Sequence, residues 1–201
     1  MTNKNGRQPY EGKMNRILFI DTETGGVNPN KHSLLSVGIV VWDAKEGIVY
    51  SNEVLIKSKE YVVTSTAQRI NHFNPKVHDE TSIEPKDFFA SIEKIYNQFF
   101  HDYQDIPLGG HNTQFDIGFI RKLYEDNGRS YEKTFSHRVV DTYSILKFLC
   151  DSGKLHLDYI SSAKAFKKFG IVVNGRHTAL GDAIATAQLY EQMILLVKNP
   201  R

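Results

Sequence analysis

Residues 17–24 read ILFIDTET, an apolar run that ends in two carboxylates, Asp21 and Glu23. An apolar run of this length, followed by two glycines, predicts a buried central strand. Because side chains alternate along a strand, Asp21 and Glu23 should point to the same face. Two neighbouring carboxylates repel each other and are costly to bury without a partner. A divalent cation removes that cost, and carboxylate oxygens suit Mg²⁺ or Mn²⁺. The alternative is a pair of acids that simply ends a strand in solvent.

A second acidic motif, HNTQFD, covers residues 111–116. It lies where a short predicted strand passes into a helix, and ligands bind at such places in open α/β sheets. Asp116 falls in the first helical turn, where backbone amides favour an anion. Taken alone, Asp116 is more simply explained as an acid at a helix start, and Asn112 as a turn or cap residue.

A third motif, HTALGD, covers residues 177–182. His177 follows a turn signal at Asn174 and Gly175, and Asp182 falls in the opening turns of the next predicted helix. A loop histidine close to a fixed acid is a suitable arrangement for a general base. The alternative is a surface histidine next to an ordinary acid at a helix N-terminus.

The elements that must position these motifs follow from the hydrophobic pattern. Three β-rich segments come first, and short connections between them favour antiparallel pairing. Helices and short strands then alternate, which predicts a mixed sheet flanked by helices, of the α/β class, in one domain. Strands are predicted at residues 17–24, 34–42, 48–56, 106–110 and 138–140, and helices at 85–100, 115–124, 142–149, 157–169 and 179–197.

Composition narrows the classes of protein. The chain has 201 residues and a net charge of only +2, so nucleic acid would have to bind through a local site. The single cysteine, Cys150, excludes an internal disulfide and a cysteine-rich zinc site. No apolar stretch is long enough to span a membrane, and the polar N-terminus lacks a secretory signal. We therefore expect a cytoplasmic protein with a flexible tail over residues 1–15.

Together, the three motifs resemble those of the DEDDh 3′–5′ exonucleases, which include bacterial proofreading subunits and ribonuclease T. The resemblance runs from about residue 17 to residue 196, with the motifs in order, and His177 matches the histidine variant of the family. The segment RVVDT at 138–142 is also similar to the family's strand-to-helix segment. The resemblance implies a ribonuclease H-like fold, with the exonuclease domain over residues 16–201.

The resemblance also implies a role for each acid. Asp21, Glu23 and Asp182 would hold one of two Mg²⁺ (or Mn²⁺) ions, Asp21 would bridge to the second, and Asp116 would assist through water. His177 would be the general base, and the product would be a nucleoside 5′-monophosphate. The residues expected to bind substrate are Thr24, Asn71, Asn112 and Arg176.

One position departs from the family pattern. Many relatives have Thr-Thr-Gly after the first motif's glutamate, whereas here Thr24 is followed by Gly25 and Gly26. Gly25 removes a side chain that would lie next to the terminal nucleotide. This difference bears on the shape of the nucleotide pocket and leaves the metal chemistry intact.

Three functions of different classes compete. The first is a free-standing 3′–5′ exonuclease acting on the 3′ ends of single-stranded DNA or RNA, which we favour because the last predicted helix ends close to Arg201. The second is a proofreading or processing subunit that works with a polymerase or repair partner. The third is a non-catalytic nucleic-acid-binding domain, which clustered negative charge disfavours. Some relatives are dimers, so a homodimer is an open alternative.

Overall fold

A mixed five-stranded sheet forms the centre of the computed structural model, which describes residues 16–158, 160–175 and 177–198. The strand order is β3-β2-β1-β4-β5. β1 pairs with β2, and β2 with β3, in antiparallel fashion, whereas β1–β4 and β4–β5 are parallel. The predicted mixed sheet is therefore confirmed. The strands are β1 (Arg16–Thr24), β2 (Leu34–Asp43), β3 (Gly47–Leu55), β4 (Ile106–Gly110) and β5 (Phe135–Asp141).

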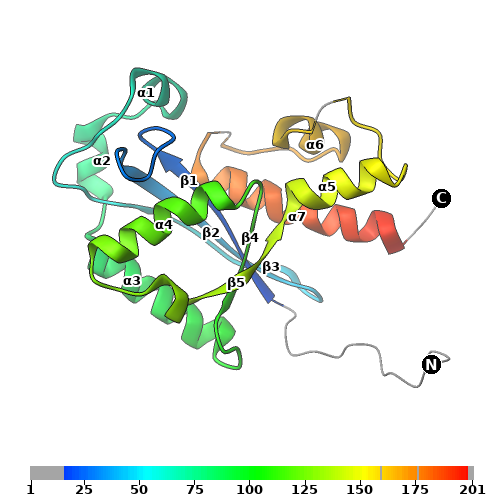
Figure 1. Cartoon of the computed structure of the whole chain (residues 1–201), viewed down its shortest axis with the longest axis horizontal. Helices are drawn as coiled ribbons and strands as arrows, with labels where there is room; N and C mark the ends of the chain where they lie inside the picture. Colours follow the sequence, from blue (N-terminus) through cyan, green and yellow to red (C-terminus); the bar gives the residue numbers. More distant parts are fainter. Residues whose placement is uncertain (1–15, 159, 176, 199–201) are drawn as a thin grey trace.

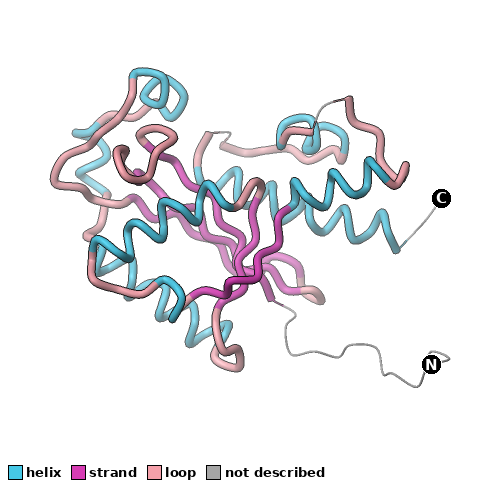
Figure 2. The backbone as a smooth tube through the Cα atoms, in the orientation of Figure 1, coloured by secondary structure: helices cyan, strands magenta, loops and turns pink. Residues whose placement is uncertain are grey.

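Helices α3 to α7 lie in two groups on either side of these strands. In Figure 1, α3 and α4 lie to one side of the sheet, and α5, α6 and α7 lie to the other. Figure 2 shows the strands converging between the two groups. The helices are α1 (Ser65–Asn71), α2 (Pro75–Thr81), α3 (Pro85–Ile95) with a π-helical continuation (Tyr96–Phe100), α4 (Gln114–Asp126), a 3₁₀ turn (Tyr131–Lys133), α5 (Thr142–Asp151), α6 (Ser162–Lys168) and α7 (Ala179–Lys198).

The alternation of β1 decides which face its acids occupy. Leu18 and Ile20 belong to the core on the α3 and α4 side of the sheet. Phe19 belongs to a separate core with Ala183 and Ala187 of α7. Asp21 and Glu23 have the same parity as Phe19, so they face the α7 side, at the end of the strand.

Glycine allows α7 to begin directly on the sheet. A Cβ on Gly38 of β2 would lie 2.1 Å from the carbonyl oxygen of Ala179, the first residue of α7. A Cβ on Gly181 would lie 2.3 Å from the carbonyl oxygen of Gly175. Both contacts are possible only without a side chain. The first turns of α7 are therefore held against β2 and against the loop that precedes the helix.

The sequence prediction missed two helices. α1 and α2 have seven residues each, and each buries a single side chain, Ala67 in α1 and His78 in α2. Such short helices show no hydrophobic period. Their capping residues are nevertheless present, because Thr64 accepts a hydrogen bond from the Ala67 amide and Asn74 accepts one from the Lys76 amide.

Other predicted bounds needed correction. The helix predicted over residues 157–169 was wrong in its first part, because α6 begins at Ser162 after Ser161, whose hydroxyl caps it. The helix predicted over residues 85–100 changes to π-helix in its last five residues. The strand predicted over residues 138–140 is longer, at Phe135–Asp141. The tail predicted over residues 1–15 lies outside the described residues.

Candidate active site

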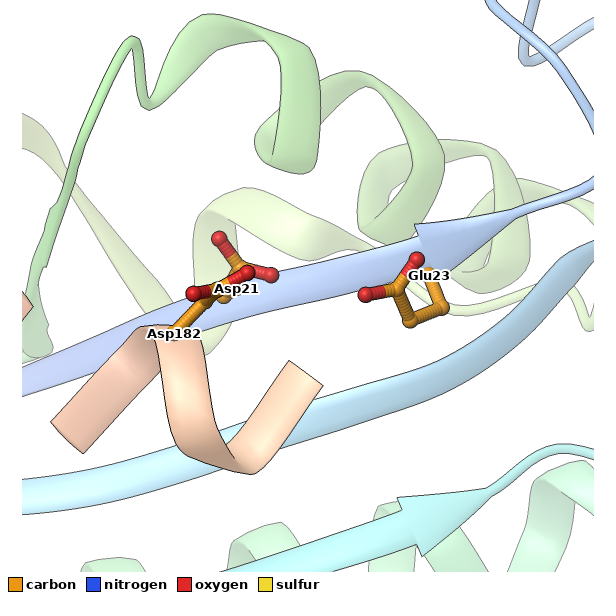
Figure 3. Close-up of side chains that lie close together, drawn as sticks. All are labelled: Asp21, Glu23 and Asp182. Atoms are coloured by element: carbon orange, nitrogen blue, oxygen red, sulfur yellow. The ribbon is translucent and has the colours of Figure 1, made fainter. Parts of the chain in front are cut away.

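Three carboxylates from two elements converge at the end of β1. One ligand oxygen each from Asp21, Glu23 and Asp182 can be chosen so that all lie within 4.8 Å of one another. Figure 3 shows the two β1 side chains with Asp182 of α7 beside them. All three are half-buried. An all-oxygen set of this kind fits a hard divalent cation such as Mg²⁺ or Mn²⁺.

The register of the sheet explains why Asp182 reaches this place. Asp21 is paired with Gly38 across β1 and β2, and Gly38 lies beneath the start of α7. Asp182 belongs to the first turn of that helix, and the backbone amide of Asp182 donates a hydrogen bond to the carbonyl of Thr178. The contact at Gly38 therefore fixes the distance between the acid on α7 and the acids on β1.

Asp116 of α4 lies beside Thr22 of β1. It is 4% exposed and accepts a 2.7 Å hydrogen bond from the hydroxyl of Thr22, the residue between the two β1 acids. The pKa of Asp116 is raised to about 7, because burial and, to a smaller extent, the negative charge of Asp141 raise it more than the hydrogen bonds from Thr22 lower it. The fourth predicted ligand thus adjoins the cluster through Thr22 but is not one of its three members.

His177 lies in the loop immediately before α7. It is exposed, and its φ of 64° places it in the left-handed region, which non-glycine residues seldom adopt. It lines a hollow together with Glu23 and with Thr178. The structure therefore brings the predicted base close to Glu23, one of the three clustered carboxylates.

The hollow beside the carboxylates has a volume of about 360 Å³. Asn71 lines it, and the amide nitrogen of Asn71 donates a 2.9 Å hydrogen bond to the carbonyl of Thr24. The hydroxyl of Thr24 is buried and donates to the carbonyl of Gly26. α1 is thereby tied to the end of β1, and Asn71 keeps its side-chain oxygen for other partners.

Asn112 lies at the end of β4, away from the hollow's lining. Its φ is 60°, and its backbone amide donates a 3.0 Å hydrogen bond to Asp141, which also caps α5 through the amide of Tyr143. The next residue back, His111, forms a 3.0 Å hydrogen bond with Thr142. Asn112 therefore forms the turn between β4 and α4 and leaves its side chain exposed.

Comparison with known proteins decides the family. The family model described as exonuclease matches residues 18–190, which is most of the chain. The chain belongs to this exonuclease family. It is 26% identical over 174 residues to the DNA polymerase III subunit epsilon of Treponema pallidum, covering 87% of this chain and 74% of that subunit. It is 27% identical to the PolC-type DNA polymerase III of Clostridium perfringens, covering 86% of this chain and 11% of the polymerase.

Solved structures show the same fold. Exonuclease I of E. coli in complex with a dA16 oligonucleotide superposes with a TM-score of 0.74 at 16% identity, over 90% of this chain and 41% of that one. A zinc-bound complex of exonuclease I with single-stranded DNA gives a TM-score of 0.75 at 17% identity, over 94% and 42% of the two chains. The exonuclease described here thus spans less than half of exonuclease I and about a tenth of the PolC relative.

The structure gives a reason for Gly25 in this exonuclease. A Cβ at residue 25 would lie 2.1 Å from the carbonyl oxygen of Val62. The backbone of Gly25 also accepts a hydrogen bond from the amide of Thr64 and donates one to the carbonyl of Ser33. The segment that leads into α1 therefore occupies the space in which a threonine side chain would lie.

Two residues that line the hollow beside the carboxylates were not predicted from the sequence. Ser36 and Glu53 both line it, and the Ser36 hydroxyl donates a 3.0 Å hydrogen bond to Glu53. Gly38 pairs with both Asp21 and Glu53, so these two acids lie in one row on the same face of the sheet. Strand pairing was the signal that could have revealed Glu53. Arg176, the remaining predicted substrate residue, lies outside the described residues.

Proposed function

We propose that this exonuclease is a metal-dependent 3′–5′ enzyme that removes nucleoside 5′-monophosphates from the 3′ ends of single-stranded nucleic acid. The observation that carries the proposal is the convergence of Asp21, Glu23 and Asp182, together with a hollow that Glu23 and His177 both line. The solved complexes of exonuclease I with single-stranded DNA support the choice of substrate.

The carboxylates would act by holding divalent cations. Asp21, Glu23 and Asp182 would bind one Mg²⁺ or Mn²⁺ ion, with Asp21 also reaching a second and Asp116 assisting through water. Two such ions, when bound, would stabilise the negative charge on the attacking and leaving oxygens. His177 would accept the proton of the attacking water, which its place in an exposed loop at the rim of the hollow permits.

The terminal nucleotide would lie in the hollow of about 360 Å³. The side-chain oxygen of Asn71 and the backbone near Thr24 would contact its sugar or base. Asn112 and Arg176 would contact the phosphates of the strand. A carboxylate such as Glu53 accepts hydrogen bonds and repels phosphate, so it would face a sugar hydroxyl or a base.

A gel assay tests the proposal directly. Single-stranded DNA and RNA, labelled at the 3′ or the 5′ end, are incubated with Mg²⁺, Mn²⁺ or EDTA and with the wild type or Asp182→Asn. We expect a cation-dependent ladder that shortens from the 3′ end and is absent with Asp182→Asn. Shortening from the 5′ end, full activity of Asp182→Asn with Mg²⁺, or activity of the wild type in EDTA would contradict the proposal.

A role inside a polymerase complex is a second candidate. It is favoured by the relatives from Treponema pallidum, named as a subunit of DNA polymerase III, and Clostridium perfringens, named as a PolC-type DNA polymerase III. Affinity purification of the tagged chain from its own cells, with polymerase subunits identified by mass spectrometry, tests this candidate. Size-exclusion chromatography with light scattering tests the homodimer, which remains an open alternative.

The cytoplasmic location also remains a prediction. Over the described residues, none of the helices has both the length and the apolar character that crossing a bilayer requires.

A further inference from the structure

A second and larger hollow lies on the α3 and α4 side of the sheet. Its volume is about 570 Å³, within the range of roughly 300–1,000 Å³ that small-ligand sites occupy. Its walls come from the β1–β2 loop, the segment that follows β3, the start of α3, and α4. It shares no lining residue with the hollow beside the carboxylates. We call it the basic hollow.

The floor of the basic hollow is apolar. Leu34, Ile56 and Phe119 line it and are each less than 10% exposed, and Leu123 lies beside them. An apolar floor suits the face of a nucleobase, which gains from stacking and from leaving water.

The rim of the basic hollow is positively charged. Four lysines line it against two carboxylates, which leaves a net charge of +2. Lys57 is paired with Glu84 at 3.8 Å, and Lys122 is paired with Asp126. The two other lysines are Lys31 and Lys59, both exposed, and neither forms an ion pair within the part of the chain that the structure describes. Two lysine ammonium groups at the rim of an apolar floor match a phosphate attached to a nucleoside.

We propose that the basic hollow binds a nucleotide unit, with its base on the apolar floor and its phosphate at Lys31 and Lys59. The unit is either part of a nucleic-acid strand or a free nucleoside monophosphate, and the two have the same chemistry at this site. Neither form takes part in the hydrolysis at the carboxylates.

The β1–β2 loop links this hollow to the carboxylates. The loop begins directly after Glu23 and Thr24, and its later residues form one wall of the basic hollow. It is held in shape by the hydrogen bonds from the Gly25 amide to the Ser33 carbonyl and from the Asn28 amide to the His32 ring. In the strand form, a strand with its 3′ end at the carboxylates would have to pass this loop to reach the basic hollow, so the strand form of the proposal rests on the proposed function. The free-nucleotide form does not.

Binding measurements on the full chain separate the two forms. Asp182→Asn in EDTA serves as the background, so that no strand is cut and the carboxylates hold no cation. Lys31→Ala and Lys59→Ala are introduced together, and Lys45→Ala with Lys94→Ala removes the same charge from exposed positions outside both hollows. A labelled oligothymidylate is titrated by fluorescence anisotropy at several salt concentrations, and AMP by calorimetry.

Each result has one meaning. If the strand occupies the basic hollow, the Lys31 and Lys59 variant binds the oligothymidylate about tenfold more weakly. The slope of the logarithm of its binding constant against the logarithm of salt concentration also falls by about one, whereas the control pair changes neither quantity. If a free nucleotide occupies it, AMP binding is lost in the same variant and retained in the control. If neither ligand distinguishes the two double variants, the proposal is overturned. Because no hydrolysis is measured, this outcome is independent of whether the wild type degrades 3′ ends.

Discussion

Gly38 of β2 lies directly beneath the carbonyl group of Ala179, the first residue of α7, so that even a methyl group at residue 38 would collide with it at 2.1 Å. This contact sets the distance between the first turn of α7 and β2. Because Asp182 is carried on the first turn of α7, the contact also sets the position of one predicted metal ligand relative to the other two.

Gly38→Ala should therefore damage catalysis more than folding. The added methyl must push the start of α7 away from β2, and a displacement of about 1 Å at a catalytic group can cost roughly a hundredfold in rate. The loss of stability should be about 1–3 kcal/mol, as for other overpacked cores. The measurements are kcat/KM on a labelled oligonucleotide and urea unfolding.

Gly118→Ala is the control, because its Cβ would meet Pro29 at an ordinary 3.6 Å. Equal activity of the two variants would refute the role of Gly38.

Asp182→Asn should abolish hydrolysis and leave the fold intact. Removing one of three clustered charges also relieves repulsion when no cation is present. In EDTA we expect the melting temperature to rise by about 2–4 °C above that of the wild type. Adding Mg²⁺ should stabilise the wild type and have little effect on the variant. Glu125→Gln, an exposed acid on α4, controls for charge alone. A variant that keeps substantial activity would remove Asp182 from the ligand set.

His177→Ala should lose about 10²–10⁴-fold in rate while keeping its stabilisation by Mg²⁺. His177→Gly should lose the same activity but be more stable than His177→Ala, because the φ of 64° suits glycine. The two variants therefore separate the chemistry of the imidazole from the strain of the backbone. Near-normal turnover in either one would mean that another group accepts the proton of the attacking water.

Asp43 should make folding stability depend on pH in the acid range. Burial raises the pKa of Asp43, but the amides of Lys45 and Glu46 and the guanidinium of Arg16 at 2.9 Å together lower it below its ordinary value of 3.8. A lowered pKa in the folded state means that this stabilisation is present above pH 3.8 and is lost as the pH falls through the folded-state pKa.

Asp43→Asn should accordingly lower the free energy of unfolding by about 1–3 kcal/mol at neutral pH. The difference from the wild type should shrink as the pH falls below that ordinary value. Urea unfolding at a series of pH values measures both effects. A constant difference across the acid range would show that packing, and not the charge of Asp43, stabilises this end of the sheet.

The strand that carries the first two acids could be predicted well because one short segment contains the whole signal. The apolar run before Asp21 marks a buried strand, and alternation places Glu23 on the same face. The position of Asp116 could not be predicted in this way. Its hydrogen bond to Thr22 depends on how α4 packs against β1, and the two residues are 94 positions apart.

The walls of both hollows were harder to predict than the carboxylates. Glu53 belongs to a strand that alternation identifies, but its row with Asp21 follows from strand register, which the sequence alone does not state. α1 and α2 were missed because helices that bury one side chain each carry no period to detect. Local signals therefore identified the chemistry, and tertiary packing determined the shape around it.

The small amount of buried surface in α1 and α2 should allow these two helices to unfold locally. Apart from Ala67 and His78, the residues of these two helices are exposed or half-buried, whereas α7 buries eight residues. The free energy of local unfolding should therefore be much lower for α1 and α2 than for the helix that carries Asp182. Amide protons of α1 and α2 should exchange with solvent before those of α7. The side of the carboxylate hollow that Asn71 lines can therefore open while the carboxylates keep their positions.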